Sequence, residues 1–95
     1  MKKRPDRVRP VHPGDFLRDD FMKPLELTAA AVARAIGARP MAVNDIIRHK
    51  RGVSPAMALK LGRLFSVPPD LLIGIQADYD LEVARDRPNQ KFASI

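Results

Sequence analysis

A chain of 95 residues is long enough to bury one modest hydrophobic core and too short for two. Its formal net charge of +6 favours an anionic partner such as nucleic acid. The lack of cysteine excludes disulfides and thiolate metal sites, and no apolar run is long enough to span a bilayer or to act as a secretory signal. We therefore expect one soluble, cytoplasmic domain.

Residues 1–11 contain five lysines or arginines, two prolines and few apolar side chains. Such a segment cannot bury enough surface to offset the entropy lost on ordering, so we expect a flexible basic arm. This arm is either a solvated tail or a segment that follows DNA phosphates or enters a minor groove. At the other end of the chain, residues 87–95 are expected to form a loosely ordered tail.

Apolar periodicity and capping residues predict five helices and no strand between the arm and the tail. The expected helices are 13–22, 29–36, 40 to about 49, one that begins at Pro55, and one from about 69 to 85. Threonine and serine are good N-caps, so we expect Thr28 and Ser54 to cap the second and fourth helices. The residues expected to face inward from the fourth helix are Met57, Leu61, Leu64 and Phe65.

Residues 28–54 predict a helix-turn-helix, the unit that places its second helix in the DNA major groove. The first helix must pass close to the second, which suits the small side chain of Ala33. The tight turn needs a residue that tolerates positive φ, which Gly37 supplies. Val43 and Ile46 lie three residues apart and would be buried, so that the other face of the second helix is free for a partner.

That free face carries side chains suited to reading base edges. Arginine fits guanine O6 and N7, asparagine fits adenine N6 and N7, and methionine can pack against a thymine methyl. Asp45 is expected either to accept from cytosine N4 or to pair with Arg48 or another neighbouring base. The candidates for base contacts are Arg39, Met41, Asn44, Asp45 and Arg48.

A basic loop, residues 49–52, follows this helix and suits phosphate contacts, which position a protein on DNA without specifying sequence. Gly52 is expected to adopt a conformation that lets the next helix begin at Ser54. The amides at the starts of the second and fourth helices can also donate hydrogen bonds to phosphates. The candidates for phosphate contacts are Thr28, Arg34, His49, Lys50, Arg51 and Ser54. The alternative interpretation is an exposed basic turn.

The last expected helix has more apolar residues than one edge of a small domain needs. Either these residues complete the core, or part of their surface is a dimer interface that matches a two-fold DNA site. The candidates for the dimer interface are Leu72, Ile75, Tyr79 and Val83.

Enzyme chemistry has little support in the sequence. His12 and His49 lie on different expected loops without a matched carboxylate, and no glycine-rich phosphate loop or HExxH motif occurs. The acidic residues Asp15, Asp19 and Asp20 lie near a helix start, where the helix dipole favours anions. We expect them to be solvated, and we expect no catalysis, no metal and no cofactor.

Three segments of this sequence resemble the HigA antitoxin family, which belongs to the lambda-repressor-like class of helix-turn-helix proteins. These segments read HPGDFLRDDFMKPLELT, ARAIGARPMAVNDIIRHKRGVSPAMALKLGRLF and PPDLLIGIQADYDLEVA, and they span roughly residues 12–84. The helix-turn-helix part is common to many repressors. More specific are the HPG start, the KRGVSPAMALKLGRLF segment and the Q-A-x-Y-D-L-x-x-A pattern from Gln76 to Ala84.

The resemblance implies an all-α, five-helix, lambda-repressor-like domain, covering residues 12–86, that forms a homodimer. It implies two roles: binding a small HigB-type ribonuclease toxin, and repressing its own operon by binding a palindromic operator in double-stranded DNA. The recognition helix would be Arg39 to His49, with Asn44 as the strongest base-contact candidate. Two alternatives stay open: a stand-alone helix-turn-helix regulator without a toxin, and an interaction protein that has lost DNA binding.

Four positions depart from the pattern that the resemblance implies. Ala29 and Ala31 stand where the family commonly has Gln and Glu, so phosphate contacts are weaker or move elsewhere, for example to Arg34. Leu72 replaces a frequent aromatic residue. His49 replaces a frequent glycine and adds partial positive charge beside DNA, which implies mildly pH-sensitive binding.

Overall fold

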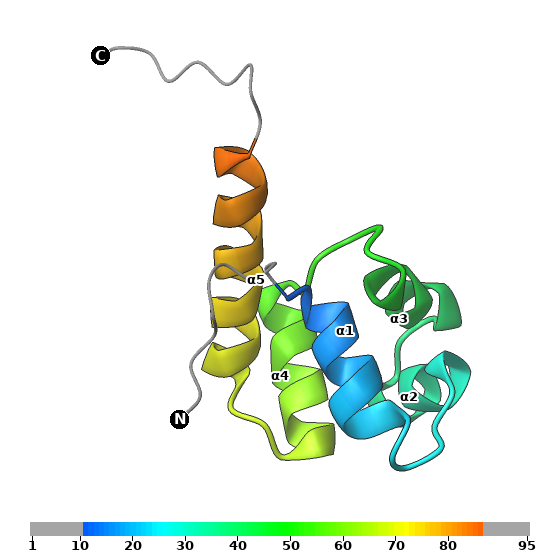
Figure 1. Ribbon diagram of the computed structural model, residues 1–95. Coiled ribbons are helices and arrows are strands. Elements are labelled where there is room, and N and C mark those ends of the chain that lie inside the picture. Colours follow the sequence, from blue (N-terminus) through cyan, green and yellow to red (C-terminus); the bar gives the residue numbers. More distant parts are fainter. Residues whose placement is uncertain (1–10, 87–95) are drawn as a thin grey trace.

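The structure is a computed structural model that describes residues 11–86. Within this range five α-helices and one π-helical turn form an all-α fold without strands, as the sequence predicts (Figure 1). In chain order they are α1 Pro13–Leu17, the π-helical turn η1 Arg18–Met22, α2 Ala29–Ile36, α3 Pro40–Ile47, α4 Pro55–Phe65 and α5 Pro69–Arg85. The expected arm, except Val11, and the expected tail lie outside the described residues.

The expected helix 13–22 is α-helical only in its first half and then widens into η1. The amide of Lys23 donates to the carbonyl of Arg18 five residues earlier, at 2.9 Å. Residues five apart lie on different faces of an α-helix, but a π turn brings them into line. Leu17 and Met22 have this spacing, and both are buried, with 1% and 6% of their surface exposed. The apolar spacing therefore explains the wide turn.

The helices α2 and α3 meet as the sequence predicts. Thr28 caps α2, and its Oγ1 accepts from the amide of Ala31 at 3.1 Å. Gly37 ends α2 in the left-handed conformation, with φ 72° and ψ 32°. Ala33 is fully buried, and so, within 1%, are Val43 and Ile46 of α3. Because its apolar face is buried, α3 can turn only its opposite face to a partner.

The start of α1 is built to pass very close to α3. Nδ1 of His12 accepts from the amide of Gly14 at 2.9 Å and so caps the helix, and Pro13 occupies the first helical position, where its missing N–H costs nothing. A Cβ atom on Gly14 would overlap the main-chain carbonyl of Ile46. The HPG sequence thus starts a helix and lets its backbone touch α3.

The helix α4 closes the core from the other side. Ser54 caps it, and its Oγ accepts from the amide of Met57 at 3.1 Å. Leu61 is buried as expected, whereas the expectation for Leu64 is wrong, because its side chain is 38% exposed. The buried stripe of α4 runs instead through residues at three- and four-residue steps, namely Ala58, Leu61 and Gly62, with Phe65 half-buried at its end. Leu64 lies beside that stripe.

The helix α5 packs its first half on α4, and Figure 1 shows its C-terminal half projecting beyond the other helices. Leu72 is fully buried in the core of the protomer. Its assignment to a dimer interface is therefore wrong, since the domain itself already covers this side chain. Among the described residues, no helix is both long and apolar enough to cross a membrane.

Candidate nucleic-acid interface

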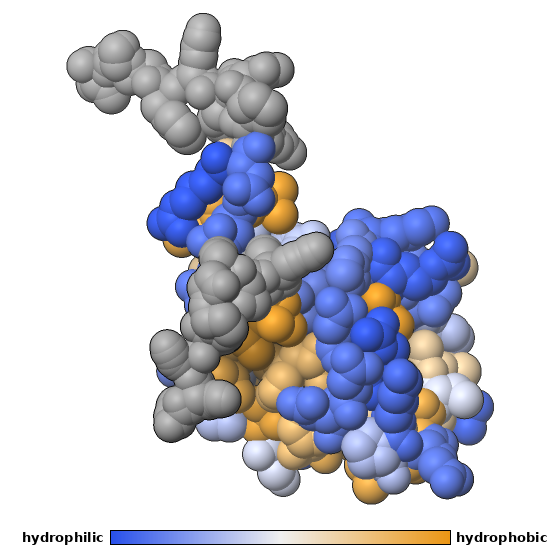
Figure 2. Space-filling view, in the orientation of Figure 1, coloured by the Kyte–Doolittle hydropathy of each residue, from blue (hydrophilic) through white to orange (hydrophobic). Residues whose placement is uncertain are grey.

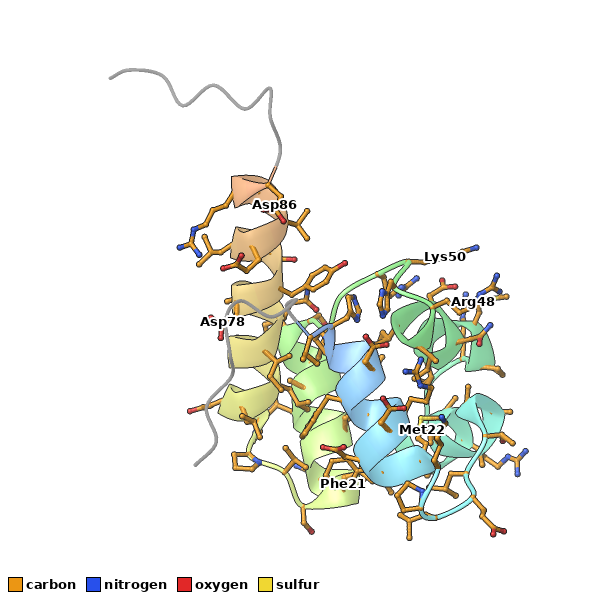
Figure 3. The ribbon with its side chains drawn as sticks, viewed as in Figure 1. Phe21, Met22, Arg48, Lys50, Asp78 and Asp86 are labelled. Carbon is orange, nitrogen blue, oxygen red and sulfur yellow. The ribbon has the colours of Figure 1, made fainter. Side chains whose placement is uncertain are left out.

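The outward face of α3 carries the side chains that the sequence predicts. Met41 is 60% exposed, which shows that the start of the helix is open to solvent. Arg39 and Arg48 are exposed at the two ends of α3, and Asn44 is half-buried between them. Figure 3 shows Arg48 and Lys50 pointing away from the core. One helix face therefore combines cations, an amide and an apolar side chain, which are side chains that can recognise base edges in the major groove.

Asp45 contacts the loop that follows the helix. Its carboxylate lies 3.6 Å from the guanidinium of Arg51. Its carbonyl accepts from the amides of Lys50 and Arg51, at 2.7 and 3.3 Å. Of the two roles expected for Asp45, the structure thus displays pairing with a neighbouring basic residue, and that residue is Arg51 rather than Arg48. The pair is half-exposed, so Arg51 can exchange the carboxylate for a phosphate at small cost.

The remaining phosphate candidates divide into two kinds. Arg34 and Lys50 are exposed cations. The hydroxyl oxygens of Thr28 and Ser54 cap their helices. A phosphate at these sites would therefore be bound by the backbone amides of the helix starts. Figure 2 shows hydrophilic surface gathered on the right of the molecule, the side of α3, and hydrophobic surface gathered towards α4.

His49 lies in the loop after α3, as expected, and its side chain turns towards α1. Its φ of 63° is in the left-handed region, which explains why the resemblance implies a glycine at this position. Its Nε2 lies 2.8 Å from Oδ1 of Asp15, and its ring stacks on that of His12 with centroids 4.1 Å apart. The side chain is therefore engaged with α1, which makes His49 a weaker phosphate candidate than the exposed cation Lys50.

Gly52 is not the left-handed residue of this loop, because Gly37 is the one glycine with positive φ in residues 11–86. Its lack of a side chain makes room for Gln76 of α5, whose Oε1 would lie 2.5 Å from a Cβ at Gly52. Oε1 of Gln76 accepts from the amide of Val53 at 2.9 Å. The helix α5 thus holds the loop that follows α3.

Sequence reasoning did not assign these positioning roles to His12 and Gln76, and it placed Tyr79 at a dimer interface. The structure packs the ring of Tyr79 edge-on against His12, at 4.8 Å between centroids. The signal was present in the sequence, because these residues belong to the HPG start and to the Q-A-x-Y-D pattern. Their spacing along the chain, however, says nothing of the contacts between them.

An all-α core with a left-handed turn at Gly37 and an outward, partly basic α3 defines a helix-turn-helix protein of the lambda-repressor-like class. No protein-family profile matches the sequence. Over 84 residues it is 31% identical to antitoxin HigA-1 of Vibrio cholerae, covering 88% of this chain and 79% of that one. Over 74 residues it is 38% identical to virulence-associated protein I of Dichelobacter nodosus, covering 78% and 68%.

The fold agrees with these relatives. It matches the solved structure of Pseudomonas aeruginosa antitoxin HigA with the higBA promoter, with a TM-score of 0.78 and 42% sequence identity, over 80% of this chain and 83% of that one. The chain belongs to the HigA family of antitoxins.

Proposed function

We propose that this protein is an antitoxin that binds and neutralises a HigB-type ribonuclease toxin and represses its own operon by binding operator DNA in the cytoplasm. The observation that carries the DNA-binding part is the outward face of α3, which is held by a buried apolar face and ends in exposed cations. Membership of the HigA family supports the toxin as the second partner.

In this proposal α3 lies in the major groove. Arg39 and Arg48 are exposed and can reach guanine, and Asn44 between them can bond bidentately to adenine. Met41 packs against a thymine methyl. Phosphate contacts come from Lys50 and Arg51, from Arg34, and from the amides at the starts of α2 and α4.

We further propose that two copies associate through α5. Leu71 and Leu81 are 45% and 50% exposed there, and Ile75 and Val83 are half-buried. A two-fold dimer would place two α3 helices in successive major grooves of a palindrome. Sedimentation equilibrium tests this: Leu81→Arg should shift the protein towards monomer, whereas Leu25→Arg, at a 59% exposed leucine before α2, should not. Equal effects of both changes would contradict the α5 interface.

The DNA-binding role is tested by selecting duplexes from a random-sequence pool and measuring their affinity by fluorescence anisotropy. Replacing Arg39, Asn44 and Arg48 together with alanine should sharply weaken binding to the selected duplex, since a good bidentate base contact discriminates by about 1–3 kcal/mol. The matched control is Arg63→Ala, which removes an exposed arginine from the last turn of α4. Unchanged affinity of the triple variant would remove α3 from the interface.

The toxin-binding role is tested by pulling tagged protein from its own cells and identifying partners by intact mass. A stoichiometric basic partner of about one domain, on the order of 100 residues, supports the antitoxin role. Recovery of DNA alone would instead indicate a stand-alone repressor, the second function that the helix-turn-helix would serve.

A further inference from the structure

Three rings meet where α1, the end of α3 and α5 converge. The imidazoles of His12 and His49 are stacked, with centroids 4.1 Å apart and 16° between their planes. Tyr79 of α5 meets His12 edge-on, with centroids 4.8 Å apart and an 80° angle. Nε2 of His49 lies 2.8 Å from Oδ1 of Asp15, which completes the contact with α1. We call these four residues the ring cluster.

His12 is constrained to one protonation state by its cap. The residue is 3% exposed, and its Nδ1 accepts from the amide of Gly14 at 2.9 Å. An acceptor nitrogen must keep its lone pair, so His12 is neutral and carries its proton on Nε2. A proton at Nδ1 would end the cap.

His49 ties the cluster to α3. Its amide donates to the carbonyl of Ile46 in the last turn of α3, at 3.1 Å. The residue directly follows Arg48, one of the base-contact candidates. The position of the His49 ring is therefore linked to the end of the recognition helix by the hydrogen bond to Ile46 and by the peptide bond to Arg48.

Building on the proposed DNA binding, we propose that the ring cluster is a latch that fixes the end of α3 against α1 and α5, and that protonation of His12 opens it and weakens operator binding. His12, His49 and Tyr79 are then positioning residues for DNA recognition, although none of them contacts DNA.

The charged groups around His12 come from every element of the cluster. Asp15 of α1 and Asp80 of α5 favour its protonated form, while burial and the neighbouring His49 oppose it. Burial is the largest of these influences, and the pKa of His12 lies below its ordinary value of 6.5. Once His12 is charged, the amide of Gly14 loses its acceptor and a cation faces His49 at stacking distance. Both effects favour an open cluster.

The latch predicts that DNA affinity changes with pH in the opposite direction from that expected of simple electrostatics. A histidine that only gained charge beside DNA would strengthen binding in acid, because each added cation neutralises phosphate. An opened latch weakens specific binding in acid, because a smaller fraction of the protein holds α3 in its binding position. The direction in which affinity changes with pH therefore distinguishes the latch from a purely electrostatic effect.

The chain allows the latch to be observed without DNA. It has two histidines, one tyrosine and no tryptophan, and all three of these residues belong to the ring cluster. The imidazole NMR signals and the tyrosine circular dichroism in the near ultraviolet therefore report on the cluster. The signals are assigned with His12→Asn. On acidification from about pH 8 to about pH 5.5, the His12 resonance and the Tyr79 dichroism should change with one midpoint. A His12 titration that leaves the Tyr79 signal unchanged overturns the proposal.

The second experiment measures affinity for a duplex selected from a random pool at about pH 7.5, over the same pH range. The Kd of the wild type should rise roughly two- to threefold in acid, as the closed fraction falls to about a half to a third. His12→Asn should bind more weakly than the wild type at neutral pH, because it removes the ring that stacks on His49. Its profile should be flat, because asparagine caps a helix but does not titrate. Asp78→Ala, at an exposed position of α5 outside the ring cluster, is the control and should behave as the wild type.

A His12→Asn profile that follows the wild type, or wild-type binding that tightens in acid, overturns the latch. Failure to select any duplex counts against the proposed DNA binding instead, and the NMR and dichroism titration then still decides whether the cluster opens. The same titration decides the question if the asparagine variant does not fold.

Discussion

Gly14 lies against the main-chain carbonyl of Ile46 so closely that no side chain fits between them. This contact joins the first turn of α1 to α3. Backbone cannot rotate aside as a side chain can, so a methyl group at Gly14 must push the two helices apart. The separation of α1 and α3 is therefore fixed by the absence of one Cβ.

We expect Gly14→Ala to lower the free energy of unfolding by roughly 1–3 kcal/mol, because overpacking at a rigid contact costs about this much. Chemical denaturation measures it. Gly74→Ala is the control, since nothing lies within 4 Å of a Cβ at that helical glycine. It should stabilise by up to about 1 kcal/mol through helix propensity. Equal gains in both variants would show that the Gly14 contact is loose.

Features decided by local chemistry could be predicted from the sequence. The bounds of α2, the caps at Thr28 and Ser54, and the left-handed Gly37 all follow from residues close together in the chain. The burial of Val43 and Ile46 follows from helical spacing against a neighbour that the motif guarantees.

Features decided by contacts between distant segments could not be predicted in this way. The left-handed residue after α3 is His49, because its ring binds Asp15 and His12, residues more than thirty positions earlier. Leu72 is apolar whether it completes the core or faces a partner, so composition alone left both choices open. Only the packing of α5 on α4 decided between them.

Gln76 should contribute to stability through one hydrogen bond to the backbone. Gln76→Ala leaves the amide of Val53, a buried residue, without its acceptor, which costs about 1–3 kcal/mol. Hydrogen exchange at the Val53 amide should speed up more than at the other loop amides. Asp78→Ala, at an exposed position of the same helix, is the control. Unchanged protection of Val53 would mean that another group takes over as acceptor.

The cap of α2 can be completed by a single substitution. Ala31 is the third residue of α2, where a Glu side chain can reach back to the amide of the capping Thr28. Ala31→Glu should therefore stabilise by about 0.5–2 kcal/mol. The gain should shrink in the double variant with Thr28→Ala, because the two halves of a capping box depend on each other. A gain of the same size in both backgrounds would point to a dipole effect alone.

The pairing of Asp45 with Arg51 makes a prediction about salt dependence. Lys50→Ala should weaken binding to all sequences alike and lower the salt slope by about one. Asp45→Asn should strengthen binding to all sequences, because it removes an anion and frees Arg51, which lies 3.6 Å away. Anisotropy titrations at several salt concentrations measure both changes. If Asp45→Asn weakens the selected duplex only, Asp45 reads a base.

Stability should decline in mild acid because of His12. Its pKa is lowered in the folded protein, chiefly by burial and then by His49, while in the unfolded chain it keeps the ordinary value of 6.5. Between these two values the unfolded chain binds more protons than the folded one, so stability rises with pH there and is fully present above about 6.5. The pKa of Asp19 is also lowered, by its hydrogen bond to Arg18, but from an ordinary value of 3.8, so its effect begins at lower pH.

Denaturant unfolding at a series of pH values measures this decline. In the wild type the free energy of unfolding should fall as the pH drops below about 6.5, and in His12→Asn the fall over the same window should be much smaller, since that variant keeps a capping acceptor without a titrating ring. His49→Asn separates the two histidines, because asparagine tolerates the left-handed backbone and leaves His12 in place to titrate. If His12→Asn left the decline unchanged, the proton that matters would bind to a group other than His12.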